Sequence, residues 1–288
     1  MFSAGVTRSL VNATCRRRAF DASVCYRFKS FATATNDPGP EGAPVTATNR
    51  AETTLKRFWK TVGIEKRGDQ FAVTLDKRPL KTPSGNQLLL PQHKKLAATL
   101  IASEWENQNT LLKHHALPMT SLTSRAIDAM GDEPTRAETR AALLKYLDTD
   151  TICFHQDDPP PLVRLQNEHW IPLLEWTRSR FGVEIMTFDS VLFYSQPAET
   201  KNKIDEVMRN FDSWEMAAME RATYATKSFI IAFALVHKHI TAEQAALAAQ
   251  VEVSSQIERW GEVEDSHDVD YHDVRRHLGS AACLLSNL

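Results

Sequence analysis

Apolar residues early in the chain alternate with turn residues over short intervals, a pattern typical of β-strands. The expected strands cover residues 58–64, 71–75 and 88–90. Polar, glycine and proline residues form the expected turns at 66–69, 76–79 and 82–86. Short strands joined by tight turns predict a small antiparallel meander, and such a sheet needs a helix to cover one of its faces.

The spacing of apolar residues then changes to three and four, which predicts amphipathic helices. The first helix is expected over residues 92–108, where Ile101 and Trp105 share one stripe. Two more are expected after Pro118 and after Glu133, where Pro134 suits a first helical turn. The first of these helices, at 92–108, is the expected cover of the sheet.

The second half of the chain is almost entirely helical by the same criterion. The expected helices cover residues 162–181, 198–211, 213–238, 241–260 and 271–285, with an irregular stretch that holds a strand at 191–194. Asp212 and Thr241 are the expected N-caps of two of them, Gln244 completes a capping box with Thr241, and Gly261 is the expected stop.

The run DDPPP at 157–161 interrupts helix and is the predicted domain boundary. It separates an N-terminal domain of strands and helices at residues 55–157 from a helical domain at 158–288. The pattern therefore predicts an α+β protein. The longest strongly apolar run, residues 229–236, is far shorter than the roughly 20 residues that span a membrane, so no membrane insertion is expected.

Residues 1–36 differ in composition from the rest of the chain. They hold six basic residues and one acid, and Phe2, Val6 and Leu10 recur every four residues. A stretch that is rich in Arg and Ser, poor in acids and amphipathic is typical of a mitochondrial transit peptide, and a disordered basic tail is the alternative. Residues 37–54 include a run rich in proline and glycine and read as a flexible linker.

Without residues 1–36 the chain has 28 basic and 35 acidic residues, a net charge of −7. A net acidic chain without a cluster of Lys and Arg is a poor candidate for holding nucleic acid. The chain also has no GxGxxG, GxxxxGK[ST] or GxSxG motif. The common phosphate-binding loops and the nucleophile elbow are thus absent from the sequence.

Several polar clusters are candidates for chemistry. His267, Asp268, His272 and Asp273 form the richest one. Imidazole and carboxylate groups together bind divalent metals, so a metal-dependent helical hydrolase is one hypothesis, and the acidic first turn of a helix is the other. The site also lacks further ligands from other parts of the chain, which favours the helix start and predicts no metal.

The remaining acidic candidates have plain structural interpretations. Asp148 and Asp150 are two residues apart, so they do not face each other on a helix, and Asp is favoured where helices end. Glu104 precedes Trp105, which is expected in the core. Glu252 lies between small and apolar residues, either as a solvated position or as a charged point inside a contact surface.

The ordered set of motifs resembles one known family, over residues 57 to 285. The motifs are RFWK at 57–60, LDKRPLKTP at 75–83, Glu104-Trp105 with Gln108, LPMTSL at 117–122, YLDTDT at 146–151, Gln166, Trp170, Pro172, Trp176, Glu252, Gln256, Trp260 and Gly261. The chain is similar to the mitochondrial F1-ATPase assembly chaperones that attend the alpha subunit of ATP synthase, the assembly factor 2 family.

This resemblance implies an N-terminal α/β layered domain and a C-terminal orthogonal helical bundle. It implies no enzyme activity and no cofactor, with a transient role in the mitochondrial matrix on the unassembled alpha subunit, as a monomer when alone. It implies partner binding by Glu252, with Gln256 and Trp260 on the same helix, and a structural role for the motifs that hold Glu104, Trp105, Asp148 and Asp150. Ser254 and Ser255 stand where relatives often carry more acid, so more of the binding falls to Glu252.

Overall fold

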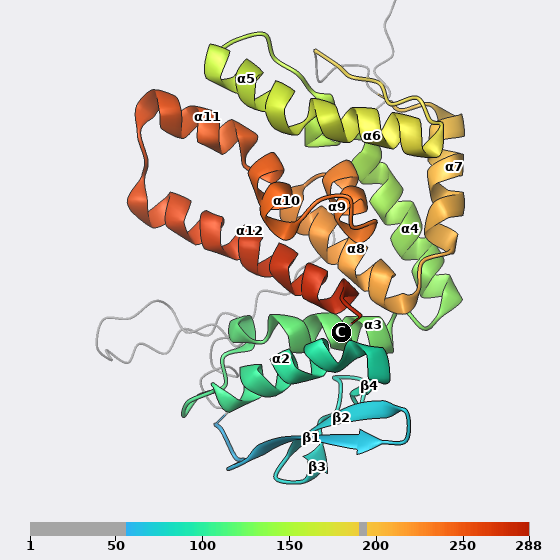
Figure 1. Ribbon diagram of the computed structural model, residues 1–288, viewed down its shortest axis with the longest axis vertical. Coiled ribbons are helices and arrows are strands. Elements are labelled where there is room, and N and C mark those ends of the chain that lie inside the picture. The colour runs from blue at the N-terminus through green and yellow to red at the C-terminus, as the bar shows by residue number, and fades with distance from the viewer. Residues whose placement is uncertain (1–55, 190–194, 288) are drawn as a thin grey trace, which may run out of the picture. The chain divides into compact units, whose positions relative to one another are not determined.

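The computed structural model describes residues 56–189 and 195–287. The expected transit peptide, the linker and the expected strand at 191–194 lie outside these residues. Within them the chain has an α+β fold with one small antiparallel sheet and many helices, as the sequence predicts (Figure 1). None of the helices in the described ranges is both long and apolar enough to cross a bilayer.

The sheet is built around its second strand. It contains β1 (Val62–Arg67), β2 (Gln70–Leu75), β3 (Arg78–Pro79) and β4 (Leu89–Pro91). β2 pairs antiparallel with each of the other three, and Val62 lies opposite Leu75 in the β1–β2 pair. The prediction that the first strand starts at residue 58 is wrong. The backbone N–H groups of Lys60 and Thr61 donate to the Asp76 carboxylate, at 3.0 and 2.9 Å, instead of to a strand.

Two helices form the layer next to the sheet. α2 (Lys95–Glu106) packs on β1 and β2 through its buried residues, which include Ala98 and Ile101. α3 (Pro118–Asp128) packs on α2 and also on two helices of the C-terminal half. The sheet is thus covered as the sequence predicts, and α2 and α3 lie between it and the remaining helices (Figure 1).

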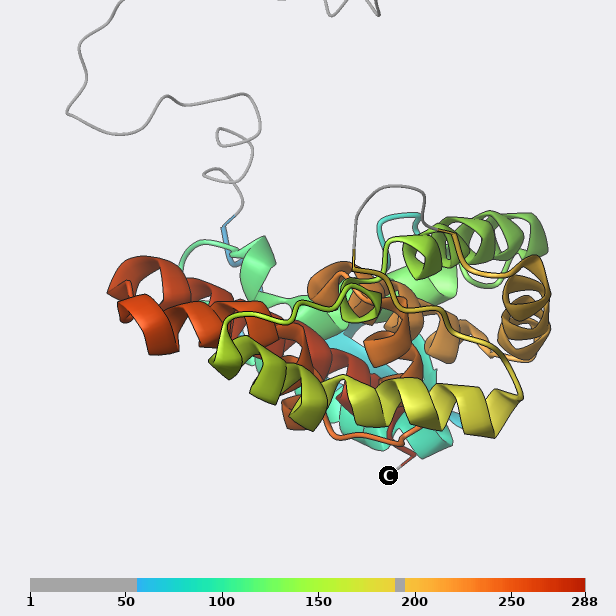
Figure 2. The same ribbon diagram turned by 90° about the horizontal axis from the view of Figure 1, so that it is seen from above.

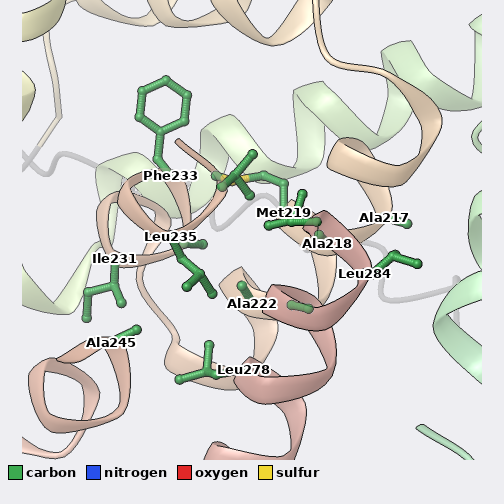
Figure 3. Packing of buried hydrophobic residues seen from close by; sticks show 14 of the residues in the cluster. Ala217, Ala218, Met219, Ala222, Ile231, Phe233, Leu235, Ala245, Leu278 and Leu284 are labelled. Carbon is green, nitrogen blue, oxygen red and sulfur yellow. The ribbon is translucent and has the colours of Figure 1, made fainter. Parts of the chain in front are cut away.

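The remaining helices include one, α9, in which all eight residues are buried, and several of the others pack on it. The remaining helices are α4 (Glu133–Asp148), α5 (Pro160–His169), α6 (Ile171–Phe181), α7 (Ala198–Arg209), α8 (Ser213–Thr226), α9 (Phe229–Val236), α10 (Ala242–Ala249), α11 (Val251–Trp260) and α12 (Glu264–Leu285). The small side chain of Ala222 in α8 lies near Leu235 of α9 and Leu278 of α12 (Figure 3). Because α9 is apolar on every side, it is stable only when it is packed against these neighbours.

The N-terminal boundaries of two C-terminal helices follow the sequence closely. Asp212 and Thr241 are the N-caps of α8 and α10, and each makes a capping box with the residue three positions on. Gly261 ends α11 with φ of 86°, a conformation that favours glycine. The boundary after residue 157 stays a prediction, and α4 from the N-terminal side packs on α7, α8 and α9.

Three helices that the sequence predicts as continuous are broken in the structure. The segment 162–181 divides at Trp170, because Pro172 has no N–H for the helical ladder. The segment 213–238 divides at Lys227, which is left-handed with φ of 55°, and Ser228 then caps α9. The segment 241–260 divides at Gln250, whose backbone leaves helical geometry between α10 and α11.

The last helix begins earlier than predicted. α12 starts at Glu264 rather than at residue 271, so its acidic first turn consists of Glu264 and Asp265. His267 and Asp268, whose cluster the sequence interprets as the acidic start of the helix, lie beyond its first turn. The residues after Gly261 favour helix over a longer loop because acids in the first turn suit the positive end of the helix dipole.

A buried lysine in the layer beside the sheet is hydrogen-bonded to the C-terminal end of the described chain. Lys94 is 3% exposed and precedes α2. Its ammonium group donates to the Ser286 carbonyl at 3.3 Å and to Asn287 Oδ1 at 2.8 Å. Burial lowers the pKa of Lys94, so these two acceptors at the C-terminal end compensate for lost water.

The junction between α8 and α9 is open to a direct test. Replacing Lys227 by glycine should raise the free energy of unfolding by about 0.5–1 kcal/mol, because glycine adopts the left-handed conformation without the penalty of a Cβ atom. The matched control is Lys145→Gly in regular helix α4, where a loss of about 1 kcal/mol is expected. Urea unfolding measures both, and a change of the same sign in the two variants contradicts this explanation.

Candidate partner-binding surface

One face of α11 points to solvent and carries three of the residues that the sequence assigns to binding. Glu252, Gln256 and Trp260 follow one another at intervals of four, and all three are exposed. Residues at this spacing lie on the same side of a helix. Trp260 is 70% exposed, and Glu252 has no hydrogen bond or ion pair within the described part of the chain. The structure therefore places a free carboxylate and a largely exposed indole on one stripe, and the Arg259 guanidinium lies over the indole, 5.0 Å from its centroid.

The opposite face of α11 is held firmly by its neighbours. Val251 and Ser255 are buried where α11 packs on α5 and α10. Arg164 of α5 donates to the Glu258 carboxylate at 2.6 Å. Trp170, beside α5, donates to the Ala248 carbonyl in α10 at 2.8 Å. These contacts fix the direction in which the exposed stripe faces.

Glu104 has a structural role at the start of α3. Its two carboxylate oxygens accept from the backbone N–H groups of Met119 and Thr120, at 2.6 and 2.9 Å, and from the Thr120 hydroxyl at 2.7 Å. Pro118 provides no N–H at this helix end, so Glu104 satisfies the next two free donors. Burial raises the pKa of Glu104, and the three hydrogen bonds oppose that rise.

Trp105 is half-buried, and the expectation that it lies fully in the core is wrong. Its indole packs edge-on against Trp59, with ring centroids 5.0 Å apart. Its Nε1–H donates to the Thr120 hydroxyl at 3.0 Å. The ring sits at the margin of the core because this polar atom must reach Thr120 at the end of α3.

The second pair of carboxylates joins helices across the fold. Asp148 accepts from the backbone N–H of Gln196 at 2.8 Å and pairs with Lys201 at 2.8 Å. Asp150 is fully buried and accepts from the backbone N–H groups of Ile152 at 3.2 Å and Ile230 at 2.8 Å. Burial raises the pKa of Asp150 to about 6, against the pull of its hydrogen bonds. Both side chains therefore anchor loops and helix ends.

The partners of these carboxylates were not apparent in the sequence. Thr120, Gln196 and Ile230 are distant in the chain from the acids that they contact. A helix start with free N–H groups is a signal that some acceptor is needed, but it does not say which one. Asp148 and Asp150 project in different directions, as their two-residue spacing predicts.

The alternative metal site does not form a ligand cluster. The described residues contain no group of three or more His, Cys, Asp or Glu side chains arranged to hold a metal ion. His267 Nδ1 accepts from the Val263 N–H at 3.0 Å, and Asp273 pairs with Arg276 and with His277. His267, Asp268, His272 and Asp273 are therefore not brought together as one ligand set.

A cavity of about 1100 Å³ lies between α3, α8 and α12. Its apolar wall includes Leu117, Leu122 and Tyr224. Charged side chains also line it, but Arg125 and Glu220 already form a bidentate pair with both distances at 2.8 Å. Since these two charges neutralise each other, this pair gives no indication of a charged ligand.

Comparison with known proteins gives the same family from sequence and from structure. Residues 56–178 match the model of the family described as ATP12 chaperone protein. "Protein atp12, mitochondrial" of Schizosaccharomyces pombe is 33% identical over 268 residues, covering 90% of this chain and 88% of that protein. The chain belongs to the ATP12 chaperone family.

Two further comparisons support this ATP12-family assignment. "Protein ATP12, mitochondrial" of Saccharomyces cerevisiae is also 33% identical, over 82% of this chain and 86% of that protein. The crystal structure of Atp12 from Paracoccus denitrificans superposes with a TM-score of 0.68 at 27% identity, over 81% of this chain and 98% of that one. The matched segment 56–178 contains Glu104, Trp105, Asp148 and Asp150, whereas α11 lies beyond it.

In this ATP12-family chain, replacing Trp105 by arginine should lower the free energy of unfolding by about 2–4 kcal/mol. The change removes the contact with Trp59 and the hydrogen bond to Thr120, and it brings a cation near Arg57, whose guanidinium already lies over the Trp59 ring. The control Trp105→Phe keeps an aromatic ring and should cost about 1 kcal/mol. Equal losses for the two variants in urea unfolding would contradict the role of the ring.

The buried carboxyl of Asp150 should make stability depend on pH. The pKa of Asp150 is about 6 in the folded chain, against an ordinary value of 3.8, so the folded state keeps the proton up to a higher pH. As the pH rises from about 4 to about 7, the free energy of unfolding of wild type should fall by about 2–3 kcal/mol relative to that of Asp150→Asn. Asp132→Asn is the control of opposite sign: hydrogen bonds from Thr135 lower the pKa of Asp132, so its contribution to stability is retained above about pH 4 and lost only at lower pH. A difference in free energy of unfolding between wild type and Asp150→Asn that does not change with pH would contradict the raised pKa of Asp150.

Proposed function

We propose that this protein is an assembly chaperone for mitochondrial F1-ATPase that holds the unassembled alpha subunit. It binds the subunit in the matrix, prevents its aggregation and releases it when alpha pairs with beta. Membership of the ATP12 chaperone family supports a holding role, and both curated relatives are named as mitochondrial. The basic, acid-poor residues 1–36 support import into that organelle.

The observation that carries this proposal is the exposed stripe of Glu252, Gln256 and Trp260 on α11. An unassembled ring subunit exposes apolar surface that its neighbours later cover, and such surface causes aggregation. Covering it requires an aromatic anchor and a few polar groups that set the register. The stripe offers both, on a helix whose other face is fixed against α5 and α10.

Holding an unassembled subunit requires a binding surface and no chemical reaction, so the proposal includes no enzyme activity and no cofactor. The most buried carboxylates, Glu104 and Asp150, are occupied by backbone donors at helix ends. The complex must be tight enough to compete with aggregation and weaker than the final ring interfaces. A dissociation constant of roughly 1 μM, about −8 kcal/mol, meets both conditions for a one-to-one complex with a monomeric chaperone.

The change Glu252→Lys tests the stripe. It should weaken binding of purified alpha subunit at least about tenfold, because it reverses the one carboxylate of the stripe, while the melting temperature stays nearly unchanged. Glu206→Lys on α7 is the matched control, since Glu206 is exposed and its carboxylate has no partner in the described chain. Binding is measured by calorimetry, and aggregation of the alpha subunit by light scattering.

Three results would contradict the proposal at different points. Normal binding by Glu252→Lys would exclude the stripe as the contact site. Equal losses for Glu252→Lys and Glu206→Lys would show a general effect of charge. Failure of the wild-type protein to bind the alpha subunit, in a pull-down from matrix extract in which F1 assembly is blocked, would exclude the function itself.

A further inference from the structure

The exposed apolar side chains of the described chain are concentrated at one place, the turn between α11 and α12. Ten large hydrophobic side chains are exposed in the described ranges. Four of these ten lie within residues 260–271, which we call the hairpin tip: Trp260 at 70%, Val263 at 60%, Val269 at 70% and Tyr271 at 45%. Such a concentration on a surface indicates a site of association.

The hairpin tip is not packed against the rest of the fold. No residue of α12 is buried before Val274, although the helix starts at Glu264. α11 packs on α5 and α10, while α12 packs mainly on α8, α10 and α3. Both ribbon views show the orange and red helices meeting at one end, away from α6 and α7 (Figure 1, Figure 2). The first turns of α12 therefore extend beyond the core.

The hairpin tip is also rigidly connected at its base. Gln250, which is 8% exposed, donates to Asp270 at 3.3 Å and accepts from Arg275 at 2.7 Å. Arg275 in turn pairs with Glu243 of α10 at 2.8 Å and lies over the Tyr271 ring. A surface that is already ordered loses less entropy when it binds.

The charge of the hairpin tip is strongly negative and mostly uncompensated. Between residues 258 and 273 there are seven acidic residues and one basic residue, Arg259. Internal partners occupy Glu258, Asp270 and Asp273. The carboxylates without a hydrogen bond or ion pair among the described residues are Glu262, Glu264, Asp265 and Asp268.

We infer that the hairpin tip is a second part of the docking surface, and that it takes a segment of the unassembled subunit in which basic residues flank apolar ones. The inference rests on the proposed function for the identity of the partner. Trp260, Val263 and Val269 supply the apolar contact, and the four free carboxylates select Lys and Arg around it. Trp260 belongs to both parts, so the surface continues from the stripe on α11 to the start of α12.

The charge also argues against other occupants. Anionic lipid headgroups and nucleic-acid phosphates would meet four unpaired carboxylates, which repel them. A second copy of this chain would set the same acids against each other across a twofold axis. A cationic segment of another protein avoids both kinds of repulsion.

Two variants separate the apolar and the charged contributions. Val263→Ser with Val269→Ser should weaken binding of purified alpha subunit by about tenfold and leave its salt dependence intact. Glu264→Lys with Asp265→Lys and Asp268→Lys should weaken binding by at least about tenfold at low salt and remove most of the salt dependence. All five side chains are exposed, so the two valine changes should leave the melting temperature unchanged. The charge reversals should lower it slightly, because Glu264 and Asp265 lie in the first turn of α12, where acids suit the helix dipole.

Matched controls carry the same changes elsewhere. Leu247→Ser with Ile64→Ser removes two apolar side chains that are each 39% exposed, away from the tip. Glu138→Lys with Glu175→Lys and Glu206→Lys reverses three exposed charges on α4, α6 and α7. The controls should bind within about twofold of wild type. If a tip variant melts early, Val269→Asp alone replaces it, and a tenfold loss is again expected.

The outcomes distinguish this inference from the proposed function. If wild type binds the alpha subunit and both tip variants bind it within twofold of wild type, the inference is overturned and the proposed function stands. No binding by wild type itself would overturn the function, and the inference with it. If wild type sediments as a dimer and the tip variants sediment as monomers, a second copy covers the tip, which also overturns the inference.

Discussion

The fold depends on burying one short helix that is apolar on every side. All eight residues of α9 are buried, so this helix is stable only when the helices that pack on it are in place. The backbone donors at its start are buried too, and Ser228 and Asp150 accept from them. Asp150 comes from the other side of the predicted domain boundary, so α9 links both halves of the described chain.

The carboxylates of this ATP12-family chain divide into two groups with different uses. Glu104, Asp148 and Asp150 point inward or along helix ends and accept from backbone N–H groups, so they stabilise the fold. Glu252 and the free acids of the hairpin tip point outward and have no internal partner in the described ranges. The inward group shapes the scaffold, and the outward group is available to another protein.

Local sequence signals predicted most elements but not every junction. The capping boxes at Asp212 and Thr241 and the stop at Gly261 depend on residues close in the chain, so they could be read directly. The breaks at Lys227 and Gln250 could not be predicted, because neither residue is a typical helix breaker. The family resemblance named the three residues of the α11 stripe, whereas their exposure on one face needed the structure.

The lysine ahead of α2 has a consequence for the order in which the molecule is completed. Lys94 belongs to the layer beside the sheet, yet the oxygens around its ammonium group come from Ser286 and Asn287. These two residues lie 192 and 193 positions later in the chain. The ammonium group therefore stays in water until α12 and the residues after it have docked, and packing of the sheet layer is completed by a segment that is remote in sequence.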